Sequence, residues 1–129
     1  MLAERIDCYT DASYGKDVGG SYIGYKIGDR PVQLQYLEGV KNTQAEVIAV
    51  IQCVEQARAL YPELGINVYT DCQKVILKLA RPEGVEYYKV KGHRGGAAVD
   101  DRPPPFVEVD RATRRALRKA RKELLGSEV

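Results

Sequence analysis

The sequence predicts an α/β protein in which a mixed five-stranded sheet carries helices on both faces. Two stretches in the first third alternate apolar and polar residues with a period of two, which indicates antiparallel strands with one buried face. A long helical stretch then leads into a later strand, and entry through a helix is typical of a parallel crossover. The predicted order is β-β-β-α-β-α-β-α, in a single domain over residues 1–129.

The first third of the chain predicts three strands joined by short turns. Residues 4–11 form the first strand, and residues 14–20, with three glycines, form a turn. Residues 21–27 alternate apolar and polar side chains, residues 28–31 form a second turn, and residues 32–37 alternate again. Strands connected in this way form an antiparallel meander.

The middle of the chain predicts two helices and two further strands. Residues 43–46 fit a capping box that would begin a helix ending at Leu60. Residues 66–70 form the fourth strand, residues 73–79 suit a short helix, and residues 85–90 form the fifth strand. Proline and glycine between these segments end each helix.

The C-terminal part predicts a proline-rich connection and an amphipathic helix. Residues 100–105 contain three consecutive prolines, so we expect no helix there. The helix is predicted from about Val107 or Asp110 to Leu124. Between Arg111 and Lys122 it has seven basic residues and no acidic residue, which makes it a candidate for holding a phosphate backbone. The alternative interpretation is a solvated outer face.

Composition indicates a globular protein of the cytosol. The chain is 44% hydrophobic and 29% charged, with a net charge of +2. No apolar run approaches the roughly 18 residues that a membrane-spanning helix needs, and the first residues lack the pattern of a secretion signal. The cysteines Cys8, Cys53 and Cys72 are odd in number and have no CxxC spacing, which favours reduced thiols. We expect a monomer in the cytoplasm that does not bind membranes.

Carboxylates follow two of the predicted strands. Asp11 ends the first strand and Asp71 follows the fourth, so the two would lie side by side if these strands are neighbours. Two ionised carboxylates at close range repel, and such a pair needs a metal ion or a shared proton. Glu46 in the first turn of the long helix and Asp110 at the start of the last helix could join them. His93 follows the fifth strand in a glycine-rich loop.

Each of these residues also has a purely structural interpretation. Glu46 could close the capping box, and Asp71 could cap the short helix. Asp110 could face a helix N-terminus, Asp11 could be a turn residue, and His93 could be a loop residue without a task.

The element order with these residues resembles the ribonuclease H family of type I, and the resemblance covers nearly the whole chain. Each matching motif is weak alone, but all five occur in family order on the expected elements. They are Tyr-Thr-Asp-Ala-Ser (9–13), Asn-Thr-Gln-Ala-Glu (42–46), Tyr-Thr-Asp-Cys-Gln (69–73), Val-Lys-Gly-His (90–93) and Val-Asp-Arg-Ala (109–112).

The resemblance implies a ribonuclease H-like fold and an endonuclease that cuts the RNA strand of RNA–DNA hybrids with two Mg²⁺ or Mn²⁺ ions. It implies that Asp11 bridges the metals, that Glu46 and Asp71 complete the metal sites, and that Asp110 holds the second metal. It also implies that His93 assists proton transfer or product release, a task that suits a pKa near neutrality. Oxygen ligands are those that Mg²⁺ prefers.

Substrate contacts are also implied by motif position. Asn42, Thr43 and Gln73 would reach the sugars and bases of the hybrid, and Ser13 would lie beside the scissile strand. Short polar side chains suit the 2′-hydroxyl, which both donates and accepts hydrogen bonds. Capping and surface solvation are the alternative roles for these residues.

The chain departs from the family pattern in two places. About a dozen residues separate Asp71 from the fifth strand, which leaves no room for the basic protrusion that grips the DNA strand in many members. Affinity would have to come from elsewhere, and reversing Arg114, Arg115 and Arg118 to Glu tests the last helix as the source. The interval from His93 to Asp110 is also long, so Asp100 or Asp101 could compete with Asp110 as the fourth ligand. We prefer Asp110 because the helix fixes its position.

Two other functions stay open at this point. One is a DNA-directed nuclease of the same fold, such as a resolvase or transposase core. The other is a catalytically silent domain that binds hybrid or RNA. The Asn42-Thr43 pair and the Gly-His loop favour hybrid cleavage over the first, and the gathered carboxylates count against the second, because phosphate must approach them.

Overall fold

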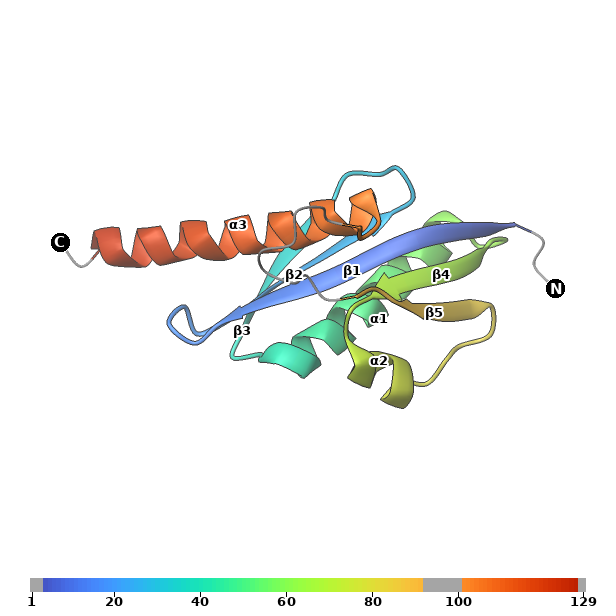
Figure 1. Ribbon diagram of the computed structural model, residues 1–129, viewed down its shortest axis with the longest axis horizontal. Helices are drawn as coiled ribbons and strands as arrows, with labels where there is room; N and C mark the ends of the chain where they lie inside the picture. Colours follow the sequence, from blue (N-terminus) through green and yellow to red (C-terminus); the bar gives the residue numbers. More distant parts are fainter. Residues whose placement is uncertain (1–3, 92–100, 128–129) are drawn as a thin grey trace.

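The computed structural model describes residues 4–91 and 101–127, which form one mixed sheet with helices on both faces (Figure 1). The fold class predicted from the sequence is confirmed. The elements in chain order are β1 (Arg5–Gly15), β2 (Gly20–Ile27), β3 (Gln33–Glu38), α1 (Asn42–Leu60), β4 (Gly65–Thr70), α2 (Gln73–Lys78), β5 (Val85–Lys89) and α3 (Pro104–Ser127).

The spatial order of the strands is β3-β2-β1-β4-β5. The first three strands pair antiparallel, as their short turns require, and β1 pairs parallel with β4, which pairs parallel with β5. The strand that carries Asp11 therefore lies at the centre of the sheet, next to the strand that leads into Asp71.

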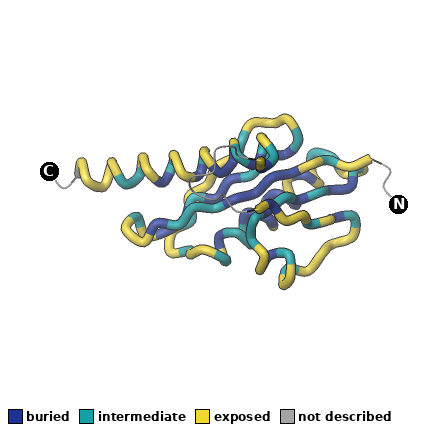
Figure 2. Tube along the Cα trace, in the orientation of Figure 1, coloured by how far each residue is buried: buried dark blue, intermediate teal, exposed yellow. Residues whose placement is uncertain are grey.

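The main core lies between the sheet and α1. Val50, Cys53 and Ala57 of α1 pack against Cys8 of β1 and Val68 of β4. Nearer the start of the helix, two alanines pack against β2, where Ala45 and Ala49 contact Ile23. Small side chains let the helix lie close to the sheet, which brings the first turns of α1 near the end of β4. Figure 2 shows the buried residues concentrated along the central strands.

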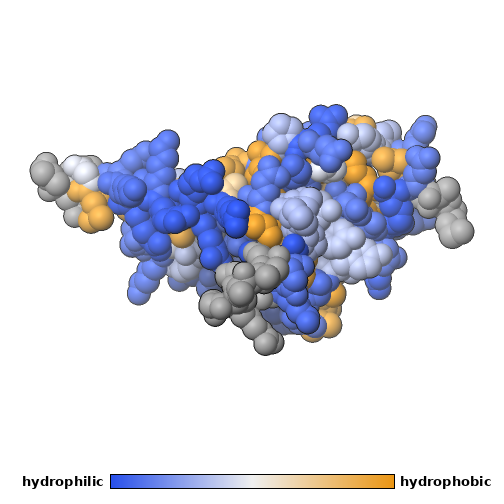
Figure 3. Space-filling model, turned by 45° about the horizontal axis from the view of Figure 1, so that its top comes forward, coloured by the Kyte–Doolittle hydropathy of each residue, from blue (hydrophilic) through white to orange (hydrophobic). Residues whose placement is uncertain are grey.

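The opposite face of the sheet is covered by α3 and has a smaller apolar core. Phe106 and Val109 pack against Tyr9 of β1 and Val90. Gly24 of β2 lies below this helix, where a side-chain Cβ would come within 2.9 Å of Thr113 and 3.2 Å of Val109. Glycine is therefore needed for the close approach of α3 to the sheet. The outer side of α3 presents a hydrophilic surface (Figure 3).

The helix starts differ from those predicted. α3 begins at Pro104, inside the proline run, because a proline in the first turn needs no N–H partner and already has a helical φ. Asp110 therefore lies in the second turn of α3. The capping box at residues 43–46 does not form: Lys41 is the N-cap of α1 without a side-chain cap, and Asn42 has a left-handed φ of 32°.

β1 and β3 also differ from the predictions. β1 continues to Gly15, so Asp11 lies within the strand instead of at its end. β3 is an edge strand, and its apolar residues Leu34 and Tyr36 are exposed. Within the described part of the chain, no helix is long and apolar enough to cross a membrane.

Candidate metal centre

The parallel ladder between β1 and β4 positions Asp11 and Asp71. The ladder ends at the pair Tyr9–Tyr69, and each aspartate follows two residues later: Asp11 within β1 and Asp71 directly after the end of β4. β4 stops at Thr70, whereas β1 continues beside β2 alone, with Asp11 opposite Gly24. The two carboxylates therefore lie close together where β4 ends beside β1.

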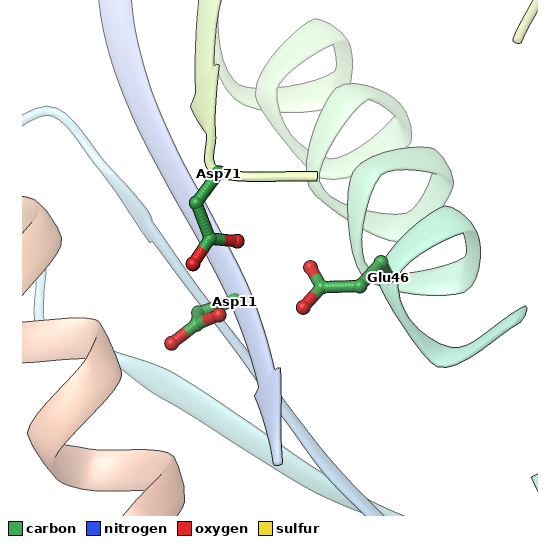
Figure 4. A group of neighbouring side chains, drawn as sticks. All are labelled: Asp11, Glu46 and Asp71. Carbon is green, nitrogen blue, oxygen red and sulfur yellow. The ribbon is translucent and has the colours of Figure 1, made fainter. Parts of the chain in front are cut away.

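Glu46 points toward these two aspartates from α1 (Figure 4). One carboxylate oxygen from each of Asp11, Glu46 and Asp71 lies within 4.8 Å of the other two. The three residues come from three elements that are distant in the sequence, and we call them the acidic triad. Neither predicted capping role applies, because Lys41 caps α1 and Cys72 caps α2.

The acidic triad is too buried and too crowded to carry three ordinary negative charges. Burial raises the pKa of Asp11 well above its usual range, and the charges of Glu46 and Asp71 raise it further. Burial, followed by the charge of Asp71, raises the pKa of Glu46 to about 9. Burial also raises the pKa of Asp71, with Asp110 adding to the effect, while Arg102 and Arg114 act in the opposite direction.

A divalent cation fits this donor set. Carboxylate oxygens are the hard ligands that Mg²⁺ and Mn²⁺ prefer. A cation between them would lower the raised pKa values of the three carboxyl groups and favour their ionised form. Glu46 contributes a further sign, because its Oε2 atom is buried and has no hydrogen-bond partner among the residues that the structure describes. A buried acceptor without a partner is costly, and a metal ion would satisfy it.

Asp110, the predicted fourth carboxylate, lies beside the acidic triad but in a different environment. It is 5% exposed, and its carboxyl forms a hydrogen bond with Asp11 that raises the pKa of Asp11. Its Oδ2 accepts a hydrogen bond from Nη1 of Arg102 at 3.0 Å, and its Oδ1 lies 2.9 Å from Nε of Arg114. Both oxygens of Asp110 are therefore engaged by arginines.

Other predicted site residues lie around this edge. Asn42 and Gln73 are exposed first residues of α1 and α2, and Thr43 is half-buried next to Asn42. Ser13 faces α3, where its Oγ lies 3.0 Å from Oγ1 of Thr113. These positions are compatible with substrate contact but leave the predicted roles untested.

Asp100 and Asp101 are the alternative candidates for the fourth metal ligand. Asp101 is exposed and is not part of the group of neighbouring carboxylates found among the described residues. His93 and Asp100 lie outside the described residues.

Arg102 is the residue of this site that sequence reasoning missed. It is 8% exposed and pairs with a residue eight positions away. Nothing in its local sequence distinguishes it from a surface arginine, because its place in the site depends on its contacts with Asp110 and Phe106 of α3. The sequence offers one signal: Arg102 directly precedes the proline run and lies eight residues before Asp110.

Comparisons with known proteins agree with this fold. No family model matches the sequence, and neither does any curated protein. Among solved structures, LC11-RNase H1, isolated from compost by a metagenomic approach, matches with a TM-score of 0.65 and 15% identity, over 91% of this chain and 98% of that chain. LC11-RNase H1 in complex with an RNA/DNA hybrid matches with a TM-score of 0.58 and 19% identity, over 88% of this chain and 99% of that chain. The fold of the chain is therefore that of these ribonucleases H1, as the sequence motifs predicted.

Proposed function

We propose that this protein is a metal-dependent endonuclease that hydrolyses the RNA strand of RNA–DNA hybrids. One observation supports the proposal above all others: three carboxylates from β1, α1 and the end of β4 meet within 4.8 Å on a ribonuclease H fold. A structural neighbour of the chain is bound to an RNA/DNA hybrid, which favours the same class of substrate. Fold alone does not set function, so the proposal depends on the site.

The acidic triad would hold a Mg²⁺ or Mn²⁺ ion, and Asp110, which lies beside it, would be the ligand for a second ion when substrate is bound. A bound divalent cation supplies an activated water and charge stabilisation at the scissile phosphate. The chain fixes the backbone of Asp11, because this residue lies on the central strand β1 between β2 and β4. It also contributes poorly hydrated surroundings, in which electrostatic interactions are stronger than in bulk water.

Recognition of the RNA strand would fall to polar residues at the same edge. Asn42 and Gln73 are exposed at the starts of α1 and α2, the helices that follow β3 and β4. Amide side chains both donate and accept, as contact with a 2′-hydroxyl and base edges requires. The left-handed φ of Asn42 is a strained conformation that asparagine tolerates better than most residues, and such strain is common at functional sites.

The grip on the backbone would come from α3. We call its seven basic residues the basic ridge: Arg111, Arg114, Arg115, Arg118, Lys119, Arg121 and Lys122. All but the half-buried Arg121 are exposed, and the ridge begins at the site itself, where Arg114 pairs with Asp110. Its charge complements phosphate, and the short segment between α2 and β5 offers no comparable cluster.

A cleavage assay tests the proposal. Labelled RNA–DNA hybrid, duplex DNA, a four-way junction and duplex RNA are each incubated with the protein in Mg²⁺, in Mn²⁺ and in EDTA. We expect metal-dependent cutting of the RNA strand of the hybrid alone, and its loss in Asp11→Asn. Asp7→Asn is the matched control, because Asp7 lies on the same strand, is exposed and hydrogen-bonds Asn67 outside the acidic triad.

The other outcomes identify the alternatives. Cutting of the junction or of duplex DNA would replace the proposal with a DNA-directed nuclease. Binding of the hybrid without cutting in either metal would indicate a silent binding domain. Equal loss of activity in Asp7→Asn and Asp11→Asn would remove the acidic triad as the catalytic centre.

A further inference from the structure

Arg102 places a permanent positive charge inside the carboxylate site. Its side chain is 6% exposed, and its Nη1 donates to Oδ2 of Asp110 at 3.0 Å. The guanidinium also lies over the ring of Phe106, with 5.6 Å from Cζ to the ring centroid. Arginine does not lose its proton in proteins, so this charge is present at every working pH.

The proline run gives Arg102 a fixed place. Pro103 restricts the backbone of the residue before it, and Pro104 and Pro105 form the first turn of α3 with a constrained φ. Arg102 therefore approaches Asp110 from the rigid entry to α3, while Arg114 approaches the other oxygen from one turn further along the helix. Helix α3 therefore contains Asp110 and Arg114, and Arg102 lies two residues before its first residue.

The acidic triad has no equivalent partners. Among the described residues, no lysine or arginine forms an ion pair with Asp11, Glu46 or Asp71. A divalent cation that enters between these three side chains meets carboxylate oxygens. A cation that approaches Asp110 instead meets oxygens already bonded to guanidinium groups and, at short range, the repulsion of the Arg102 charge.

We propose that Arg102 is a positioning residue that holds Asp110 and stands in for a second cation, so that without nucleic acid the site binds one divalent ion, at the acidic triad. Asp110 then faces Asp11 as a carboxylate whose charge the chain itself balances. The inference deepens the proposed function and rests on it for the class of cation.

Titration calorimetry with Mn²⁺ on the metal-free full chain tests this inference. We expect one ion to bind wild-type protein. In Arg102→Gln, a second ion should bind at least about tenfold more tightly than any second event in wild type, because removing a like charge favours the cation. Arg102→Lys keeps the charge and should keep the wild-type stoichiometry. Arg81→Gln is the matched control, since it removes an exposed ion pair of similar length, 2.9 Å to Glu86.

The results that overturn the inference are specific. Two ions in wild type, or an Arg102→Gln isotherm that matches wild type or loses the first ion, would each do so. If circular dichroism shows that Arg102→Gln does not fold, Asp110→Asn decides, because it keeps an oxygen acceptor for Arg102. The single ion should then bind within about threefold of wild type, whereas loss of that ion would show that Asp110 is already one of its ligands.

Parallel cleavage assays separate this inference from the proposed function. A wild-type protein that cuts no hybrid but shows stoichiometry dependent on Arg102 would reject the function and keep the role of Arg102. A protein that cuts hybrid but binds two ions whether or not Arg102 is present would keep the function and reject that role. A wild-type protein that binds no divalent ion would reject both.

Discussion

Asp11, Glu46 and Asp71 share one small volume with no basic partner among the described residues, whereas Asp110, on the neighbouring helix, is paired with two arginines. The first group comes from the sheet and α1, and the second from α3 and its entry. All four carboxylates lie close together, yet their charge is balanced in two ways: Asp110 forms ion pairs with two arginines, whereas the acidic triad forms no ion pair with a described residue.

Because of this difference, one part of the site should depend on pH and ion concentration, and the other should not. A carboxylate balanced by arginine keeps its environment over the whole working range of pH, because arginine stays charged. Carboxylates balanced by a bound ion or by a proton depend on ion concentration and pH, since metal ligands must be deprotonated. The acidic triad should therefore respond to solution conditions, and the Asp110 cluster should act as its fixed support.

The largest expected effect is the opposite response of the two groups to removal of one charge. Asp11→Asn should lower hybrid cleavage by about 10²–10³, the scale for losing one preorganised electrostatic contact. In EDTA the same change should raise the free energy of unfolding, because it relieves repulsion by Glu46 and Asp71. Asp110→Asn in EDTA should lower it, since Arg102 loses the charge of its buried partner. Urea unfolding measures both.

Asp7→Asn serves as the control for both variants, because Asp7 is exposed on the same strand as Asp11. Its free energy of unfolding should change little in EDTA. If Asp11→Asn and Asp110→Asn shifted stability in the same direction, the two groups of carboxylates would not differ in their charge balance.

A second prediction concerns pH. The pKa of Glu46 is about 9 in the folded chain, above its ordinary value of 4.5. Its protonation therefore stabilises the fold fully below about pH 4.5, and this contribution is lost as pH rises toward 9. Urea unfolding in EDTA should show lower stability at pH 8 than at pH 5.5. Added Mn²⁺ should restore stability mainly at pH 8, where ligands lose protons more easily.

The pH dependence should become weaker in Glu46→Gln, because this position no longer titrates, while Asp11 and Asp71, whose pKa values are also raised, keep part of it. A wild-type protein with the same stability in EDTA at both pH values would mean that the acidic triad carries its charges without a cation or a proton.

A third prediction concerns the arginines of the basic ridge and their contribution to hybrid binding. Because Arg114 pairs with Asp110, a clean test spares it and reverses Arg111, Arg115 and Arg118, which share the exposed side of α3. Hybrid affinity should fall by about tenfold or more, and the slope of log K against log salt should decrease by about one per lost contact. Fluorescence anisotropy at several salt concentrations measures both.

Reversal of Arg30, Arg58 and Arg81 is the matched control, because these exposed arginines lie outside α3 and the net charge changes equally. It should lower affinity less and leave the slope nearly unchanged. Equal effects of the two triple variants would reduce the basic ridge to a solvated surface.

The acidic triad could be predicted from the sequence, whereas the pairing of Asp110 with Arg102 could not, and the reason is physical. Asp11 and Asp71 follow strands whose pairing is implied by local pattern, and the parallel register then brings them together. Arg102 lies before α3 and pairs with Asp110 in the second turn of that helix, a contact that hydrophobic periodicity does not predict. The capping box fails for a similar reason: the N-cap of α1 is Lys41 and not Thr43, so Glu46 lies two residues further into the helix than a capping box requires.

The smallest expected effect concerns Ser13, whose predicted substrate role meets a structural competitor. Oγ1 of Thr113 donates to the backbone oxygen of Asp110 at 3.0 Å, so its single hydrogen is used, and the Ser13 hydroxyl must donate to Thr113. Ser13 thus links β1 to the turn of α3 that holds Asp110. Ser13→Ala should lower the free energy of unfolding by about 1 kcal/mol, the usual value of one such bond, with little change in KM for the hybrid. Urea unfolding and steady-state kinetics measure these quantities, with Ser127, the last residue of α3, as the control position. A large rise in KM without loss of stability would instead place Ser13 against the substrate and confine the support of Asp110 to its arginines.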